Sequence, residues 1–472
     1  MQSLGVRRGD RIAIYLEKRI ETVVTIFAAS AAGVVFVPIN PVLKPQQVRH
    51  ILADSGARVL ITSTERLGQL TASLEGTAVE HTVVVGRTPD GAMPTVHTWT
   101  EGQQAAGEPP ASPVVDVDPA AILYTSGSTG KPKGVVLSHR NLIVGAESVS
   151  SYLENTSEDV ILSVLPLSFD AGLSQVTTAF SVGAHVVLMN YLLPREVPKL
   201  CEKYGVTGLT CVPPLWIQLV DVQWPESART LRYFANTGGR MPRATLNKLR
   251  AMFPQAKPFL MYGLTEAFRS TYLDPSEVDN RPDSIGKAIP NAEILVLRPD
   301  GTPCAPGEEG ELVHRGALVA LGYWNDPVRT AERYRPIPHP EQSWRAPELA
   351  VWSGDTVVAD EDGFLYFVGR KDEMIKTSGY RVSPTEVEEA AYSTGLVRDA
   401  VALGRADPTL GHRIVLVASP TSPELDETAL ITALRQVLPL YMVPSEVRLQ
   451  PELPRSPNGK FDRNLITAEV AG

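Results

Sequence analysis

Cysteine is scarce in this chain, which has only three among its 472 residues: Cys201, Cys211 and Cys304. None of them belongs to a CxxC pair, and the sequence contains no HExxH motif. These absences argue against a disulfide framework and against a structural zinc site. Thiols without a pairing motif are typical of a reduced protein, so we expect a cytoplasmic location.

Blocks of like charge are missing as well, since no run of five acidic or five basic residues occurs. The formal net charge is −9, whereas a nucleic-acid partner requires a clustered basic surface, so we expect no nucleic-acid partner. A hydrophobic content of 43% with 21% charged residues is typical of a globular protein. The length predicts about three structural units.

One stretch without charge, residues 22–43, is long enough to cross a bilayer. It is interrupted by Gly33, Pro38 and Pro41, and much of it is alanine. We expect a helix over about 20–32 and a buried strand after it, and therefore no membrane span.

From residue 11 to about residue 261, short apolar runs alternate with helical stretches. This alternation is the pattern of βαβ units and parallel sheets covered by helices. The strand candidates are RIAIYL, VVFVPI, ARVLIT, TVVVG, AAILYT, VILSVLP, AHVVLM, TGLTCV and LRYFAN. The segment 101–120, rich in proline, glycine and glutamate, is interpreted as a surface linker between two halves.

The pattern of predicted secondary structure changes twice toward the C-terminus. Residues 282–368 have short strands and the turns PDG and EDG, which predict a small antiparallel unit; after residue 369, helices and short strands mix. We expect an α/β fold with a large N-terminal domain of two doubly wound, mainly parallel sheets plus a small antiparallel β unit. A small α+β C-terminal domain follows. The expected bounds are 1–369, a junction at 370–372, and 373–472.

The segment YTSGSTGKPKGVVLSH, residues 124–139, predicts an anion-binding loop. Its spacing does not fit a Walker loop, which needs glycine at position 125 and serine or threonine at position 132. Glycines nevertheless let backbone N–H groups face a phosphate, while hydroxyls and two lysines add donors and positive charge. Such a loop is suited to binding a triphosphate. From the loop alone, a solvent-exposed hairpin loop that binds nothing remains the alternative interpretation.

Other segments settle the interpretation. MYGLTEA (261–267), WSGD (352–355), GRKDEMIKTSGYRV (369–382) and LPRSPNGKFDR (453–463) follow in order, together with GELVHRGALVALGYWNDPVRTAERY (310–334). With the loop, they resemble the motifs of the adenylate-forming superfamily over nearly the whole chain. That superfamily includes AMP-dependent acyl-CoA synthetases, amino-acid adenylation domains and luciferases. The chain starts almost at GVRRGDRIAI, so we expect its first domain to be shortened at its start relative to the family.

The resemblance implies an enzyme that uses ATP and Mg²⁺ to turn a carboxylic acid into an acyl-adenylate with release of pyrophosphate. A thiol, either CoA or the phosphopantetheine of a carrier protein acting in trans, then displaces AMP. It implies Lys460 as the catalytic lysine between the two anions, Glu266 with Thr265 as the catalytic pair, and Glu266 with Thr125 at the metal. Placing a cation where negative charge develops is what this chemistry requires.

The resemblance also implies the nucleotide-binding residues. Tyr262 would stack on adenine and Asp355 would accept the ribose hydroxyls, while Arg240 departs from the acidic or small residue common in relatives. The full set is Thr125, Ser126, Gly127, Ser128, Thr129, Gly130, Lys131, Gly238, Gly239, Arg240, Tyr262, Gly263, Asp355 and Arg370.

Asp372 falls at the hinge position of the family, so the C-terminal domain is expected to be a mobile lid that rotates between the two half-reactions. This rotation would move Lys460 away and bring in the thiol channel, with Lys376 and Gly379.

The sequence does not decide which carboxylic acid is the substrate. Phe169 and Asp170, in LPLSFDAG, are expected at the acid pocket. An aspartate there can pair with a substrate ammonium, which favours an amino or imino acid, or it can cap the helix that follows. The alternative to an acyl-CoA synthetase is a stand-alone amino-acid adenylation enzyme that loads a separate carrier protein. A luciferase-like oxygenase and a non-catalytic nucleotide sensor are less favoured, since Lys460 and Glu266 are both present.

Overall fold

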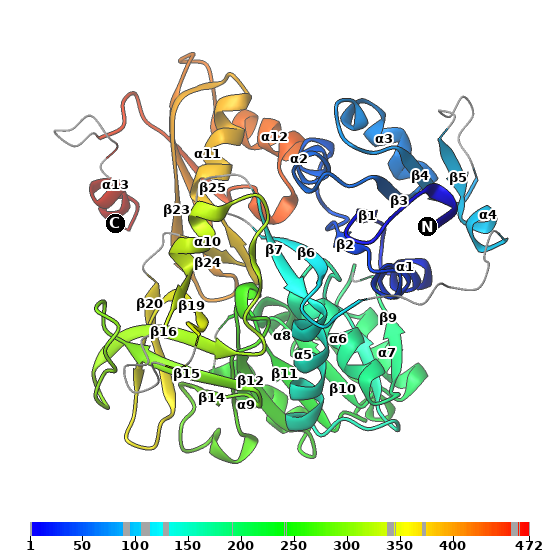
Figure 1. The fold of residues 1–472 in the computed structure, drawn as a ribbon. Coiled ribbons are helices and arrows are strands. Elements are labelled where there is room, and N and C mark those ends of the chain that lie inside the picture. The colour runs from blue at the N-terminus through cyan, green and yellow to red at the C-terminus, as the bar shows by residue number, and fades with distance from the viewer. Residues whose placement is uncertain are drawn as a thin grey trace.

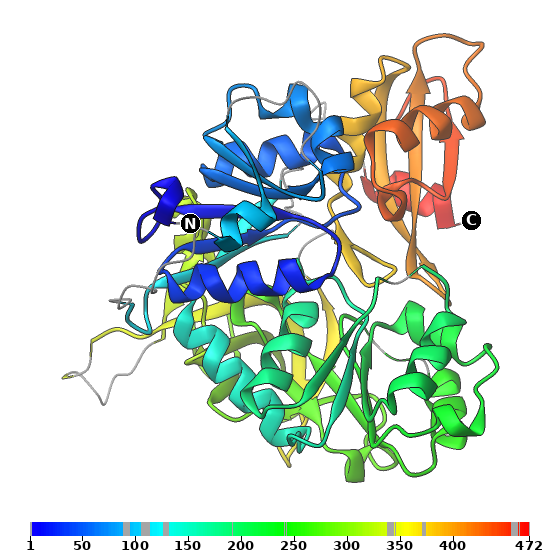
Figure 2. The same ribbon diagram turned by 90° about the vertical axis from the view of Figure 1, so that its right-hand side faces the viewer.

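The structure is a computed structural model of the whole chain. It describes residues 2–87, 95–104, 114–125, 132–190, 192–239, 241, 243–337, 344, 346–370, 374–454, 461 and 463–471. Figures 1 and 2 show three layered bodies of sheet and helix, with the C-terminal body beside the first one. Within the described residues, no helix has the length and apolarity that crossing a membrane requires.

The first sheet has eight strands in the order β17-β7-β6-β2-β1-β3-β4-β5. Its pairs are parallel except at one edge, where β7 and β17 run antiparallel. Its strands are β1 (Arg11–Tyr15), β2 (Val35–Pro38), β3 (Val59–Ser63), β4 (His81–Val85), β5 (Val96–Thr98), β6 (Pro119–Thr125), β7 (Lys133–Ser138) and β17 (Gly322–Tyr323). The helices between them are α1 (Ile20–Ala31), α2 (Pro45–Ser55), α3 (Thr64–Leu74) and α4 (Trp99–Gln104).

The segment 101–120 is not a linker between two halves, as the sequence suggested. Its ends belong to α4 and β6, and the strands on either side of it, β5 and β6, lie in the same sheet. Its proline-rich composition marks a connection within one sheet.

The second sheet has twelve strands, in which β9, β8, β10, β11 and β12 are parallel and the rest antiparallel. The antiparallel strands predicted over 282–368 extend this sheet through the β13–β14 pair. Its strands are β8 (Val160–Ser163), β9 (His185–Leu188), β10 (Gly208–Cys211), β11 (Tyr233–Asn236), β12 (Lys257–Tyr262), β13 (Thr271–Leu273), β14 (Ser284–Ala288), β15 (Ala292–Leu297), β16 (Glu309–Gly316), β18 (Tyr334–Pro336), β19 (Leu349–Ala359) and β20 (Leu365–Arg370).

The helices on the two faces of the second sheet's parallel half are α5 (His139–Tyr152), α6 (Asp170–Ser181), α7 (Glu196–Tyr204), α8 (Pro213–Leu219) and α9 (Arg243–Met252). Helix α10 (Pro327–Arg333) contacts β17, β18 and β19. The short helices are η1 (Gln2–Leu4), which precedes β1, and η2 (Glu226–Ala228), η3 (Thr265–Ala267) and η4 (Pro275–Glu277).

A shared layer of helices joins the two sheets. The main apolar core combines Ile26 of α1, Val149 of α5 and Val176 of α6 with strand residues of both sheets, such as Phe36 and Phe259. Separate cores cover the outer faces, where α2 and α3 pack on the first sheet and α7 to α9 on the second. Because both faces of each parallel strand are buried, these strands appear in the sequence as continuous apolar runs.

The third body is a five-stranded sheet built from residue 375 onward, with helices on both faces. It consists of β21 (Ile375–Thr377), β22 (Tyr380–Val382), β23 (Val397–Asp407), β24 (Gly411–Pro420), β25 (Glu446–Leu449), α11 (Pro384–Ser393), α12 (Glu427–Val437), η5 (Leu440–Met442) and α13 (Arg463–Ala471). Figure 1 shows α11 and α12 close to α2 of the first body. The α/β fold class expected from the sequence is confirmed.

Candidate active site

The predicted phosphate loop connects β6 to β7. Its residues 126–131 lie outside the described residues, but their flanks, Thr125 and Lys133, are paired across the two strands. The hydroxyl of Thr125 is buried and has no hydrogen-bond partner among the described residues. Buried hydroxyls rarely stay unpartnered, so this oxygen is available to a ligand at the loop.

Glu266, in the short helix η3, lies at the centre of a buried polar cluster and is 1% exposed. Its Oε1 accepts hydrogen bonds from Lys133 Nζ at 3.1 Å and from the Tyr323 hydroxyl at 2.7 Å. Lys133 Nζ also donates to the Tyr323 oxygen at 2.8 Å. The three residues come from η3, β7 and β17, which meet because β17 pairs with β7.

Burial alone would raise the pKa of Glu266, but the charges of Lys133, Arg333 and Arg381 hold it well below its ordinary value. Burial lowers the pKa of Lys133, against the opposing effect of Glu266. A carboxylate that stays ionised in a buried place is a ligand that a hard cation prefers. Thr265, the first residue of η3, is adjacent to it.

The predicted nucleoside residues Tyr262, Gly238 and Gly239 lie at the ends of neighbouring strands, and Asp355 lies within β19. Tyr262 ends β12, and its hydroxyl donates to Asp355 Oδ2, on β19, at 2.5 Å. Gly238 and Gly239 follow β11, the parallel neighbour of β12. Ligands of open α/β sheets bind at this carboxyl edge of the strands. The backbone of Arg370 is paired with Asp355 across β19 and β20.

The predicted acid pocket contains a cation that the sequence interpretation missed. Asp170 is the first residue of α6, and its Oδ1 accepts from the N–H of Ala171 at 2.7 Å. Its Oδ2 lies 3.7 Å from Nη1 of Arg269, whose side chain is 4% exposed. Burial raises the pKa of Asp170, although Arg269 opposes this. The helix N-cap is Phe169, which makes no side-chain capping bond, so Asp170 is not an N-cap residue.

The hairpin β21–β22 of the third body reaches this pocket. The ring of Tyr380 contacts that of Phe169 edge-on, with 5.0 Å between centroids. Gly379, between the two strands, has φ +81°, and a Cβ there would lie 2.9 Å from Cβ of Val212. Lys376 Nζ lies 4.8 Å from the ring centre of Phe367. The hairpin therefore packs on the second body beside the acid pocket.

A second contact joins the third body to the first. Gln47 Nε2 of α2 donates to Glu386 Oε1 of α11 at 3.2 Å and lies 3.8 Å from the sulfur of Met442. Glu386 Oε2 is buried without a hydrogen-bond partner among the described residues. Burial raises the pKa of Glu386 to about 7.

Several predicted site residues lie outside the described residues. They are Ser126, Gly127, Ser128, Thr129, Gly130, Lys131, Arg240, Asp372 and Lys460.

The structure brings together the predicted residues around Glu266, around Tyr262 and around Phe169. It adds Tyr323 and Arg269, to which the sequence interpretation gave no role. Tyr323 lies inside the family-like segment 310–334, and Arg269 lies two residues after MYGLTEA, so proximity to those motifs was the available signal. No cluster of three or more histidine, cysteine, aspartate or glutamate side chains suited to a metal occurs in the described part of the chain.

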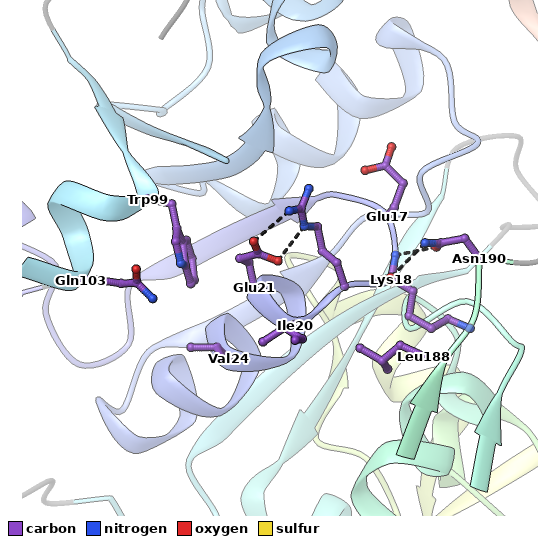
Figure 3. A pocket seen from close by; sticks show the side chains of 10 residues that line it. Glu17, Lys18, Ile20, Glu21, Val24, Trp99, Gln103, Leu188 and Asn190 are labelled. Atoms are coloured by element: carbon purple, nitrogen blue, oxygen red, sulfur yellow. Dashed lines mark hydrogen bonds and ion pairs between the residues drawn. The ribbon is translucent and has the colours of Figure 1, made fainter. Parts of the chain in front are cut away.

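A separate groove of about 710 Å³ lies on another face, between α1 and α4. Figure 3 shows Trp99 and Gln103 of α4 across from Glu21 and Val24 of α1. At its edge Lys18 donates from its ammonium group to the carbonyl of Ser163 at 2.5 Å. None of the predicted site residues lines this groove, so it is not the predicted acid pocket.

Comparisons with known proteins cover the whole chain. A family model of AMP-binding enzymes matches residues 1–324, and a model of the AMP-binding enzyme C-terminal domain matches residues 386–460. A long-chain-fatty-acid–CoA ligase of Salmonella typhimurium is 30% identical, covering 100% of this chain and 87% of the relative. An L-proline–[L-prolyl-carrier protein] ligase of Streptomyces coelicolor is 34% identical, covering 98% and 87%.

Solved structures are similar as well. A double mutant of o-succinylbenzoate CoA synthetase from Bacillus subtilis, bound to a product analogue, aligns with a TM-score of 0.82 at 26% identity, covering 99% of this chain and 90% of that one. An amide bond synthetase from Marinactinospora thermotolerans shares the fold, with a TM-score of 0.84 at 23% identity, covering 99% and 92%.

Proposed function

Because the chain belongs to the AMP-binding enzyme family and is an AMP-forming acid–thiol ligase, we propose how its residues divide the work of two half-reactions. In the first, the carboxylate of an acid attacks the α-phosphate of ATP, forming the acyl-adenylate and releasing pyrophosphate. In the second, a thiol attacks the acyl carbon and AMP leaves. The thiol is that of CoA or of a carrier protein's phosphopantetheine, and we propose a cytoplasmic location.

The ionised, buried Glu266 is the observation that carries this assignment. It lies beside the ends of β6 and β7, where the unpartnered hydroxyl of Thr125 flanks the phosphate loop. Mg²⁺ would be held by Glu266 and Thr125 together with phosphate oxygens, since magnesium sites commonly combine one or two protein ligands with phosphates. The ion would neutralise the phosphates. Lys133 keeps Glu266 ionised and oriented before the ion binds.

The strand ends at Tyr262 and Gly238 would hold adenine, and Asp355 would hold the ribose hydroxyls. The 2.5 Å bond from Tyr262 to Asp355 fixes the orientation of both side chains relative to each other. A fixed orientation of nucleotide and acid lowers the entropic cost of bringing two anions together. Lys460 would then lie between the carboxylate and the α-phosphate as a mobile cation.

We further propose that residues 370–372 form the boundary between domains 1–369 and 373–472, with Asp372 as the hinge. β20 ends at Arg370 in the twelve-stranded sheet, and β21 begins at Ile375 in the five-stranded sheet, which supports a boundary between them. The packing of Gly379 and Tyr380 beside the acid pocket supports a thiol-transfer role for this arrangement.

A second candidate is the activation of an amino or imino acid for a separate carrier protein. An aspartate at the place of Asp170 can bind a substrate ammonium, but here Arg269 already faces this carboxylate, so the support for this candidate is the similarity to a relative that acts on an imino acid. The proline ligase of Streptomyces coelicolor acts on such a substrate.

ATP–pyrophosphate exchange over a panel of carboxylic acids tests the proposal, followed by thioester formation with CoA or a carrier protein. Lys460→Ala should abolish exchange and leave the thermal unfolding temperature unchanged. Asp372→Pro should spare exchange and slow thioester formation. Near-normal exchange in Lys460→Ala, or equal loss of both half-reactions in Asp372→Pro, would contradict the assigned roles.

A further inference from the structure

The side chain of Arg269 is a buried cation with no hydrogen bond to the described residues. Its side chain is 4% exposed, and its one charged contact is the 3.7 Å approach of Nη1 to Asp170, too long for a hydrogen bond. Its Nε is fully buried and has no partner among the described residues. A guanidinium carries five N–H donors, and buried polar groups in folded proteins are nearly always satisfied. The exception at Arg269 therefore points to a partner supplied by a ligand.

Arg269 lines a small cavity behind Asp170. The cavity lies between helices α5 and α6 and the strands β8 and β10 to β12, and it is lined by Val149, Leu153, Asn155, Ile161, Ala171, Ser174, Gln175, Thr178, Ala179, Thr210, Tyr233, Met261 and Arg269. The centres of water-sized molecules have about 20 Å³ there, which is room for about one water. An extended alkyl chain therefore does not fit as the side chains stand.

The other polar groups of this cavity are largely satisfied. Gln175 bonds to the backbone of Leu162, Leu165 and Thr210, and Ser174 contacts Thr178 at 3.4 Å. Asn155 Oδ1 is the other lining atom recorded without a partner, and it is an acceptor. Among the described lining residues, unused donor capacity is thus concentrated on Arg269.

The charge of the pair decides which substrate group suits it. Asp170 already balances Arg269, so an ammonium bound to Asp170 would leave two buried cations facing one carboxylate. That arrangement is unfavourable because a buried charge needs its own partner. An oxygen acceptor, in contrast, would satisfy N–H groups of Arg269 that otherwise stay unpaired.

On the premise of the ligase function above, we propose that Arg269 is a specificity-determining residue that donates hydrogen bonds to a second oxygen group of a short acid. That group is a neutral carbonyl or hydroxyl oxygen on the part of the substrate that enters the pocket beside Asp170, since a second carboxylate would leave two buried anions facing one guanidinium. The proposal places short oxygen-bearing acids ahead of alkyl acids and amino acids as substrates.

Matched acids of two lengths test this selectivity in pyrophosphate exchange. The first set is butanoate, 4-hydroxybutanoate, succinate and 4-aminobutanoate; the second is propanoate, 3-hydroxypropanoate, malonate and β-alanine; pyruvate and L-proline are added. The wild-type enzyme should favour at least one hydroxy or keto acid over its alkyl and amino counterparts by at least about tenfold in kcat/KM, since a site built to bond an oxygen rejects an analogue lacking it. A preference for the alkyl or amino members would overturn the proposal.

Variants of the pair separate its two charges. Arg269→Met should remove the preference through the KM of the acid, with the KM of ATP unchanged, and Arg269→Lys should keep part of it. Asp170→Asn leaves the pocket cationic and should shift selectivity toward succinate or malonate by about tenfold. Arg250→Met, at an exposed arginine paired with Asp279, is the control and should change nothing.

The outcomes keep the two proposals apart. An unchanged preference in Arg269→Met, with pyrophosphate exchange intact, refutes the role of Arg269 alone. Absence of exchange with every acid in the wild-type enzyme refutes the assigned reaction and with it this inference. Thermal unfolding of each variant identifies a loss of activity that comes from a loss of fold, and in that case the Arg269→Lys and wild-type selectivities decide.

Discussion

Glu386 makes the contact between the third body and the first dependent on pH. Its carboxyl group is 9% exposed at the start of α11, bonded to Gln47 of α2, with Glu389 as the neighbouring charge and Tyr441 close by. Burial raises its pKa from 4.5 to about 7. If the C-terminal domain leaves α2, the carboxyl group becomes solvated and its pKa returns toward the ordinary value.

The docked arrangement thus holds a proton that the undocked one releases. Below about pH 4.5 the group is neutral in both, and docking costs nothing. As pH rises toward 7, docking becomes progressively less favourable, and above 7 the full cost of burying the charge applies. A pKa change from 4.5 to about 7 corresponds to a cost of up to about 3 kcal/mol, or roughly three hundredfold in the docking equilibrium.

Glu386→Gln removes this charge and retains the shape of the side chain. We expect the rate of thioester formation from preformed acyl-adenylate in the wild-type enzyme, divided by the rate of the variant at the same pH, to fall between about pH 4.5 and 7 and to stay level above pH 7. The ratio removes the ionisation of the attacking thiol, which the two enzymes share. Single-turnover rates measured from pH 5 to 9, with pyrophosphate exchange measured in parallel, check this. Glu424→Gln, at an exposed glutamate of the same body, is the control. An identical pH slope in Glu386→Gln and wild-type enzyme would refute the reasoning.

Three further variants test the site. Gly379→Ala should slow thioester formation at least about tenfold and spare pyrophosphate exchange. A φ of +81° disfavours a Cβ by about 1–2 kcal/mol, and Val212 at 2.9 Å would in addition clash with it. The control Gly395→Ala, with φ +69° and open space, should show a far smaller effect, and equal effects of the two variants would contradict the channel role. Lys133→Met should abolish pyrophosphate exchange and lower the free energy of unfolding in urea by about 3–5 kcal/mol, because it leaves Glu266 buried without its closest cation. The control Lys199→Met, at an exposed lysine, should lower the free energy of unfolding by less than about 0.5 kcal/mol. Gly172→Ala should raise the KM of the acid and destabilise the fold by about 1–3 kcal/mol, because a Cβ there would lie 2.0 Å from the carbonyl oxygen of Pro166. Gly102→Ala, in open space, is the control. An unchanged KM of the acid in Gly172→Ala would contradict the coupling of α6 to the pocket.

The sequence predicted the parallel strands well. Each of the nine quoted strand segments overlaps a strand of the structure, from β1 to β11, and the helix expected over 20–32 is α1 at Ile20–Ala31. Buried parallel strands are apolar on both faces, so their signal is local. The role of segment 101–120 could not be predicted, because composition marks an exposed connection but not which strands it joins.

The candidate site likewise contains residues that local motifs predicted and residues that only the fold brings together. Glu266, Tyr262 and Asp355 were predicted from motifs, since each motif holds its functional residue at a fixed place in a turn or strand end. Tyr323 and Arg269 needed the fold: β17 brings Tyr323 to β7, and the chain after η3 places Arg269 beside Asp170, 99 residues earlier.

By itself, the sequence determined the family, the order of the strands along the chain and the candidate residues of the nucleotide site, because these depend on local patterns of apolar, glycine and charged residues. Only the tertiary structure decided that Asp170 has a buried guanidinium beside it and that Glu386 meets Gln47 across two bodies. Such pairings depend on which residues the fold brings close together in space. A single sequence contains no local pattern that links residues far apart along the chain.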